Sequence, residues 1–254
     1  MTEHGTPASA STAAGRSRLL ADPIGDAGGR WLLSTEVLGR SKDHGYPNGF
    51  VYYFLGRGGV LGDVDANVVT AAFGFFRPEL VRRMWELGLS VEPPRQAAVR
   101  YGAACAEYGR AHLAEFSAAG RFAELAERVV DGASVMGLPL FAGWRAEDRP
   151  DDVPARAQFT AHVMREWRGS AHVAAAAAAG LNPLESILAR HGADRAKLFG
   201  WSEPFEDASH LAARREQCEA MTDEICGKAL DASLDPAEQD ELVDLAGQML
   251  AQMT

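Results

Sequence analysis

Hydrophobic residues recur along most of this chain at the three- and four-residue spacing of an amphipathic α-helix. The clearest stretches are residues 78–88, 95–113, 121–130 and 155–179, and several of them begin at proline or end at glycine. Further helices are predicted over residues 183–191, 194–200, 205–226 and 236–254. No long segment alternates with a period of two, so the pattern predicts a mostly α-helical fold with few or no strands.

Residues 50–55 are apolar on every side, and periodicity alone leaves a buried strand and a buried helix open. The glycine-rich stretch GRGGVLGDVD follows at residues 56–65 and resembles the start of a dinucleotide-binding turn. The G-x-G-x-x-G spacing requires glycine where Leu61 stands, and Gly62 comes one residue late. Asp63 and Asp65 would repel a pyrophosphate at a helix N-terminus, so we reject a nucleotide site here.

Two polar stretches divide the chain. Residues 1–20 are rich in small and polar residues and lack the apolar region of a signal peptide, so they are predicted to be a disordered lead. Residues 146–154, AEDRPDDVP, are charged and contain two prolines. They separate a helical half at residues 21–146 from a second half at residues 155–254.

The net charge of −10 is concentrated near the C-terminus, since residues 203–254 contain three bases and thirteen acids (3 − 13 = −10). The remainder sums to zero and offers no broad positive field for nucleic acid, so DNA is not an expected partner. No apolar run approaches the ~20 residues of a bilayer span, and we expect no membrane partner and a cytoplasmic protein. The three scattered cysteines, Cys105, Cys218 and Cys226, are predicted to be buried free thiols.

Two motifs together resemble a known family. Residues 49–81, GFVYYFLGRGGVLGDVDANVVTAAFGFFRPELV, resemble the pattern YF-x-G-R-x-x-P-L-G … V-V-T-A-x-F-x-x-F-x-P. Residues 165–186, REWRGSAHVAAAAAAGLNPLES, resemble L-R-E-x-R-G-x-x-H-V-A-A-L-x-x-A-G-L-x-x-x-E. These patterns are typical of an actinobacterial family of tandem helix-turn-helix proteins without a settled function. The resemblance covers roughly residues 30–230 and implies two winged-helix-like halves joined by long helices.

The chain also departs from the family pattern. Val60 stands where family members usually carry proline, and Asp63 and Asp65 are additions to the loop. Where the family pattern has a two-stranded wing, residues 200–226 are helical in pattern, so the wing of the second half is predicted to be lost. Because winged helices commonly use the wing together with the recognition helix on DNA, this loss argues against DNA binding.

Asp63 and Asp65 have two interpretations. In the simpler one, Asp65 caps a helix and Asp63 belongs to a turn. In the functional one, Arg57 pairs with Asp63 across the glycine bend, and one carboxylate activates a water beside an aromatic wall. The predicted catalytic residues are then Asp63, Asp65 and His172, and the predicted substrate-binding residues are Tyr52, Tyr53, Arg57, Phe73, Phe76, Arg165, Trp167 and Arg168.

Arg165, Arg168 and His172 have the spacing i, i+3, i+7 and share one helix face. They either bond to neighbouring backbone and acids, or form a basic face that meets the loop of Asp63 and Asp65 between the halves, with His172 exchanging a proton. His162 and Glu166 have the spacing of two metal ligands but no third ligand, so neither a metal nor a cofactor is expected.

Two functions are consistent with these patterns. The first is a small-molecule hydrolase or binding protein acting on a natural-product-like compound, with self-resistance by water-mediated opening of an aziridine or epoxide as a specific form. The alternative is a transcription regulator or ligand sensor in which residues 183–191 and 194–200 form the helix-turn-helix. Arg190, Arg195 and Lys197 would then contact phosphates. A homodimer through residues 205–226 and 236–253 is expected by analogy with the fold type.

Overall fold

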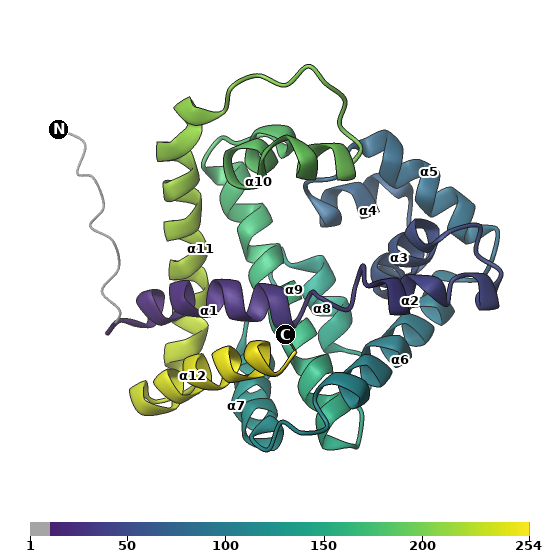
Figure 1. Ribbon diagram of the computed structural model, residues 1–254. Helices are drawn as coiled ribbons and strands as arrows, with labels where there is room; N and C mark the ends of the chain where they lie inside the picture. Colours follow the sequence, from purple (N-terminus) through teal and green to yellow (C-terminus); the bar gives the residue numbers. More distant parts are fainter. Residues whose placement is uncertain (1–10, 254) are drawn as a thin grey trace.

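Residues 11–253 are described by a computed structural model of the chain, and within that range every regular element is helical (Figure 1). This confirms the predicted mostly α-helical fold class. The α-helices are α1 (Ala13–Ala27), α2 (Thr35–Gly39), α3 (Gly49–Gly58), α4 (Ala66–Phe73), α5 (Pro78–Leu89), α6 (Pro94–His112), α7 (Ala119–Gly132), α8 (Pro139–Arg145), α9 (Val153–Ala178), α10 (Pro183–Leu198), α11 (Ala212–Ser233) and α12 (Pro236–Gln252). Short 3-10 helices are η1 (Lys42–His44), η2 (Gly59–Leu61) and η3 (Ser209–Leu211).

The long helix α9 is the centre of the molecule. It packs against α6, α7 and α8 on one side and against α1 and α11 on the other (Figure 1). Asp152 caps its N-terminus by accepting a hydrogen bond from the backbone N–H of Ala155, and Pro154 occupies the first turn. Small residues such as Ala161 and Ala171 are fully buried, which allows neighbouring helices to approach closely on several sides.

The predicted disorder of residues 1–20 is wrong for residues 11–20. Helix α1 begins at Ala13 and packs against α11 and α12. Leu20 is buried in this contact, Ser17 Oγ donates to Asp223 (3.1 Å), and the Arg16 guanidinium pairs with Asp240. Tertiary burial therefore orders a segment whose composition alone is typical of disorder. The rest of that prediction, residues 1–10, lies outside the described residues.

Residues 50–55 belong to a helix, α3, which decides the alternative that periodicity left open. Asn48 caps the helix through a hydrogen bond to its side chain from the backbone N–H of Val51 (3.0 Å). Residues 51–58 are all buried, because α2, α5 and α6 surround the helix. A helix covered on every side has no polar face and therefore no helical period.

The C-terminal helices follow the sequence pattern except at the ends of α11. Helix α10 contains a break at Gly192 (φ +74°), as the separate predictions for residues 183–191 and 194–200 indicate. Helix α11 begins at Ala212 rather than at residue 205 and extends to Ser233. Helix α12 begins with the predicted capping box of Asp235 and Glu238.

One main hydrophobic core runs through the two predicted halves. It contains large buried side chains from α3, α6 and α8 together with residues of α9, α11 and α12. A smaller cluster, including Ala175, Leu181, Leu211 and Cys218, connects the end of α9 to α11. The division at residues 146–154 into winged-helix-like halves stays a prediction. No helix within residues 11–253 is both long and apolar enough to cross a bilayer.

Candidate functional site

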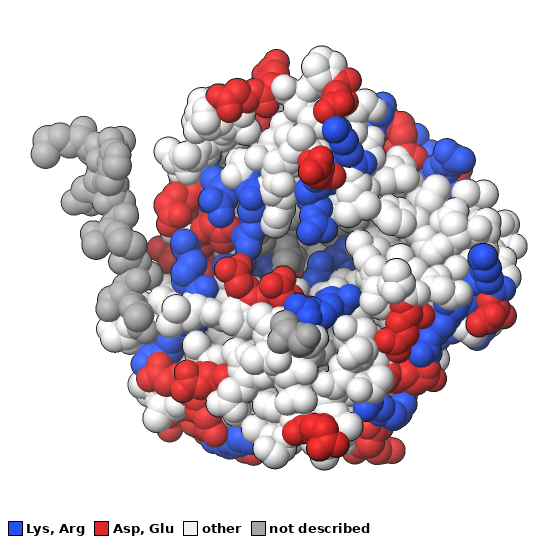
Figure 2. Space-filling model, in the orientation of Figure 1, with Lys and Arg blue, Asp and Glu red and all other residues white. Residues whose placement is uncertain are grey.

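A cleft of about 530 Å³ lies between α1, α9 and α10. Residues of α1 and the turn after it form one wall, α9 and α10 form the others, and Tyr53, Phe75 and Phe76 provide an aromatic side. Figure 2 shows basic side chains gathered around a hollow near the centre of the face that Figure 1 presents. We call this space the arginine cleft, after the side chains of Arg30, Arg165, Arg168, Arg190 and Arg195 that line it.

Three of these arginines are held by acidic side chains. Arg165 donates to Glu166 (2.7 Å), and Arg168 donates to Glu219 (3.3 Å) and to Asp223 (3.0 Å). Arg190 bridges α11 and α1 through Glu219 (2.6 Å) and Asp22 (3.2 Å). These contacts fix the guanidinium groups in place on the cleft wall.

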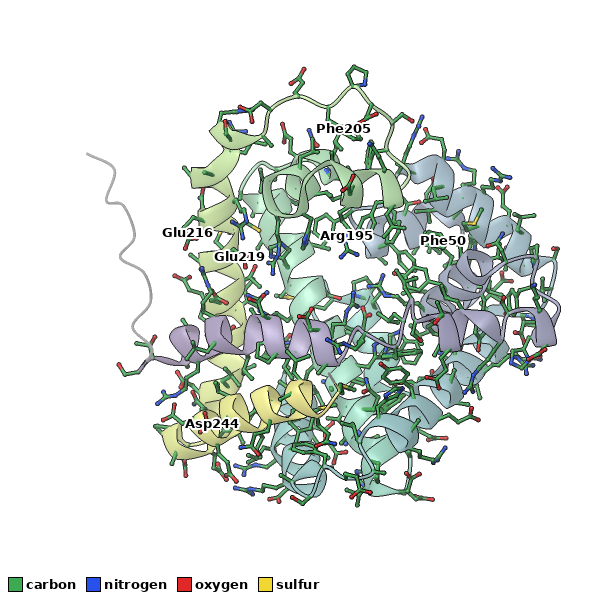
Figure 3. The ribbon with its side chains drawn as sticks, viewed as in Figure 1. Phe50, Arg195, Phe205, Glu216, Glu219 and Asp244 are labelled. Carbon is green, nitrogen blue, oxygen red and sulfur yellow. The ribbon has the colours of Figure 1, made fainter. Side chains whose placement is uncertain are left out.

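Arg30 and Arg195 have no acidic partner within residues 11–253. Arg30 donates to the backbone carbonyl of Met253 (2.8 Å), and the Arg195 guanidinium lies 5.8 Å from the ring centroid of Phe199. Both side chains are exposed, and Arg195 lies at the opening between α10 and α1 (Figure 3). They are therefore the cations of the cleft that are most available to an anionic ligand.

A buried ion pair lies behind the cleft. Arg57 makes a bidentate contact with Glu166 (2.8 and 2.9 Å), and its third hydrogen bond goes to the hydroxyl of Tyr53 (3.0 Å). Burial raises the pKa of Glu166, but the charges of Arg57 and Arg165 outweigh it and lower that pKa to about 2. The expected pairing of Arg57 with Asp63 is therefore wrong, because the buried guanidinium turns toward α9 instead of the exposed loop.

His172 lies on the cleft wall in a defined tautomer. Its Nδ1 is 3.1 Å from Oγ1 of Thr222, and that hydroxyl donates its single hydrogen to the carbonyl of Cys218 (2.8 Å). The Thr222 oxygen must then accept from Nδ1–H, which leaves Nε2 unprotonated in the neutral ring. Burial, supported by the charges of Arg168 and Arg190, lowers the pKa of His172 to about 4. His172 is thus neutral near pH 7.

The aromatic side of the cleft connects α10 to the segment after α4. Phe76 and Phe199 stack with ring centroids 4.0 Å apart, and the indole N–H of Trp201 donates to the carbonyl of Phe75 (3.0 Å). The ring of Phe75 contacts His172 edge-on at 5.9 Å. These contacts close the cleft on the side of Tyr53 with an apolar surface.

Asp63 and Asp65, the predicted catalytic carboxylates, are exposed and do not line the arginine cleft. Asp65 accepts a hydrogen bond from the backbone N–H of Asn67 (2.8 Å) and caps α4, as in the simpler interpretation of this residue. The basic face of Arg165, Arg168 and His172 does exist, but it faces α1 and α10 rather than the loop of these two acids.

The other predicted substrate-binding residues separate into two groups. Tyr53, Phe76, Arg165 and Arg168 line the arginine cleft. Tyr52, Phe73 and Trp167 are buried outside it, and Arg57 lies under the Phe73 ring at 4.5 Å. Tyr52 borders a separate groove of about 640 Å³ beside α6. That groove is larger, but its arginines are each paired with a glutamate, so we take the arginine cleft as the candidate site.

Metal-binding clusters of three or more candidate ligands are absent from residues 11–253. His162 is fully buried and packs edge-on against Trp31 and Trp144 (centroid distances 4.9 and 4.5 Å). The three cysteines are buried and free, as predicted. Burial raises the pKa of Cys218 to about 11, which makes that thiol a poor nucleophile at neutral pH.

Several cleft residues had no functional signal in the sequence. Arg30, Asp22 and Phe75 follow no motif, and only the fold brings them to the cleft. Arg190 and Arg195 stood out as basic residues of a helix-turn-helix, where phosphate contacts were expected. That signal identified the right side chains but not the surface that they face.

Comparisons with known proteins place most of the chain in one family. No curated protein and no solved structure matches the sequence. A family model described as a helix-turn-helix family matches residues 30–254. This match covers every helix from α2 to α12 and leaves α1 outside it. The chain therefore belongs to a helix-turn-helix family.

Proposed function

We propose that this protein binds a small organic anion in the arginine cleft. The observation that carries the proposal is that two arginines of the cleft, Arg30 and Arg195, have no acidic side-chain partner among residues 11–253. Fixed guanidinium groups in a partly enclosed space favour a carboxylate or phosphate, which they can bind through paired hydrogen bonds. His172, one of two histidines that line the cleft, is neutral near pH 7, so the positive charge of the cleft comes from its arginines.

The apolar side of the cleft supports an organic ligand rather than an inorganic ion. Tyr53, Phe75, Phe76 and Phe199 offer ring faces and edges opposite the basic wall. A volume of about 530 Å³ is in the range of small-molecule sites. The proposed ligand thus combines an anionic group with a flat or apolar body.

Isothermal titration calorimetry with simple probes tests this proposal. We expect benzoate and phenyl phosphate to bind, and benzylamine, which has the same ring and the opposite charge, not to bind. Arg195→Ala should weaken binding of phenyl phosphate about tenfold or more, because it removes a charge-assisted contact. Arg82→Ala, on the exposed face of α5 outside the cleft, is the matched control.

Two outcomes would overturn the proposal. Equal affinity for benzylamine and phenyl phosphate would show that the charge of the cleft does not select the ligand. Unchanged affinity in Arg195→Ala together with Arg30→Ala would show that the two unpaired arginines take no part in binding.

Water-mediated opening of an aziridine or epoxide is a finer proposal for the same site. Asp63 and Asp65 lie outside the cleft, so a reaction inside it would use His172 as the proton acceptor. If Asp63→Asn and Asp65→Asn preserve turnover of an epoxide probe and His172→Gln abolishes it, the assignment of His172 as the proton acceptor is supported. Loss of turnover in the two aspartate variants would instead assign catalysis to Asp63 and Asp65.

The second candidate function is a DNA-binding regulator, which membership of a helix-turn-helix family favours. The two parts of α10, before and after Gly192, would be the helix-turn-helix. Arg190 and Arg195 line the cleft, however, and Lys197 pairs with Glu203 (2.8 Å), so few basic groups are left for phosphates. A gel-shift titration at several salt concentrations tests this function, and specific binding that falls steeply with salt would establish it.

A further inference from the structure

The hydroxyl of Tyr53 has an unusual hydrogen-bond assignment. Its oxygen accepts a hydrogen bond from Nη1 of Arg57 (3.0 Å), and the hydroxyl makes no other hydrogen bond to residues 11–253. A guanidinium is always a donor, so this contact can use only the oxygen of the hydroxyl. The phenolic hydrogen is left without an acceptor in the described protein, at a residue that borders the arginine cleft.

Arg57 is held too firmly to release this hydroxyl. It is buried, its other donors make the bidentate contact with Glu166, and its guanidinium lies 4.5 Å from the centroid of Phe73. A buried, bidentate arginine pair has a defined geometry and does not exchange partners easily. The acceptor role of the Tyr53 oxygen is therefore permanent, and the hydrogen is available for another group.

Glu166 connects Tyr53 to a second cleft residue. The same carboxylate accepts from Nη1 of Arg165 (2.7 Å), whose side chain is partly exposed on the cleft wall. That single bond leaves further N–H groups of the Arg165 guanidinium without a partner in the described range. One buried acid thus holds two donors, the Tyr53 hydroxyl through Arg57 and the Arg165 guanidinium directly.

We propose that Tyr53 and Arg165 form an oxyanion subsite of the arginine cleft, with the Arg57–Glu166 pair as the positioning group behind it. Tyr53 donates its hydroxyl hydrogen to a carboxylate or phosphate oxygen of the ligand, and Arg165 contacts the same anionic group. This inference rests on the proposed function, since it assigns the contacts of the proposed anion. It places the anionic group next to the aromatic side of the cleft.

Affinities for phenyl phosphate, measured by calorimetry in single and double variants, test the subsite. Tyr53→Phe removes only the hydroxyl and should weaken binding about tenfold, the effect of losing one hydrogen bond to a charged group. Tyr46→Phe removes a hydroxyl that bonds to Glu92 outside the cleft and should leave the affinity unchanged. Circular dichroism and thermal unfolding confirm that each variant is folded.

Arg57→Lys separates positioning from a merely structural role. In the wild-type background it should weaken binding about as much as Tyr53→Phe, because it releases the hydroxyl. In the Tyr53→Phe background it should have no further effect, since Arg57 then has no hydroxyl to orient. An equal loss in both backgrounds would contradict the positioning role.

The outcomes distinguish the subsite from the function on which it rests. Wild-type affinity in Tyr53→Phe, with phenyl phosphate still dependent on Arg195, would overturn the subsite and leave the proposed function standing. Failure of the wild-type protein to bind either anionic probe would overturn both.

Discussion

At the residue scale, Glu166 is the side chain on which the candidate site depends most. It is about 1% exposed and lies between Arg57 and Arg165. Glu166 therefore acts on the cleft only through the side chains that it holds. The sequence placed Arg165, Arg168 and His172 on one helix face and singled out Glu166 only for its metal-ligand spacing to His162. Its partner, 109 positions away in the chain, could not be found from spacing along a single helix.

Glu166→Gln should destabilise the protein by about 3 kcal/mol, because it leaves the charge of Arg57 buried without a counterion. Urea unfolding followed by circular dichroism measures this difference. Glu79→Gln is the control, since Glu79 pairs with Arg77 on the surface (2.9 Å) and such pairs contribute about 1 kcal/mol at most. Equal stability of the two variants would contradict the cost of leaving the Arg57 charge buried without a counterion.

At the element scale, α10 differs from the other long helices. It buries only Ile187 and Ala196, and its break at Gly192 turns the second part toward the aromatic side of the cleft. The sequence predicted this break from the glycine itself. It could not show which surface the helix covers, because the partners of α10 come from α1, α11 and the segment after α4.

Gly192→Ala should destabilise the protein by about 1 kcal/mol, since a Cβ is unfavourable at a φ of +74°. The side chain itself meets no atom within 4 Å, so the effect reports the backbone conformation alone. Gly247→Ala in α12 is the opposite control, because this helical glycine also has free space around it and alanine should stabilise by roughly 0.5–1 kcal/mol. Thermal unfolding measures the stability of both variants. A stabilising effect of Gly192→Ala would contradict the positive φ at the helix break.

At the scale of the whole molecule, the contact of α1 with the C-terminal helices α11 and α12 holds the fold together. Helix α1 packs against α11 and α12, and the N-terminal and C-terminal ends of the described chain lie against one core (Figure 1). In this fold His162 is fully buried between Trp31 and Trp144, and His172 is largely enclosed, so both rings are neutral near pH 7. The stability of the whole protein should therefore depend on pH in the range where histidine titrates.

The free energy of unfolding should decrease as the pH falls below about 6.5. Burial lowers the pKa of His162 to about 3 and that of His172 to about 4, so the unfolded chain takes up protons that the folded chain cannot. The fully buried His162 alone should contribute a loss on the order of 2 kcal/mol between pH 6.5 and pH 5. Urea unfolding across this range measures the slope, and His162→Gln should reduce it. A flat profile from pH 7 to pH 5 would contradict the neutral buried state of His162.

The sequence by itself determined what depends on local chemistry. Helical periodicity, capping residues and glycine or proline at helix ends predicted α5, α6, α7, α9, the two parts of α10, and α12, because these signals act within one or two turns. The capping role of Asp65 and the buried thiols were readable for the same reason. Two family motifs were enough to indicate the helix-turn-helix family.

Only the tertiary structure decided what depends on contacts between distant segments. It ordered α1 by burying Leu20, paired Arg57 with Glu166 instead of Asp63, and brought Arg30 and Arg195 to one cleft. These outcomes follow from long-range packing, in which a side chain is placed by helices far away in the sequence. The spacing of residues along one helix carries no information about such partners, so the loop of Asp63 and Asp65 stood out in the sequence while the cleft did not.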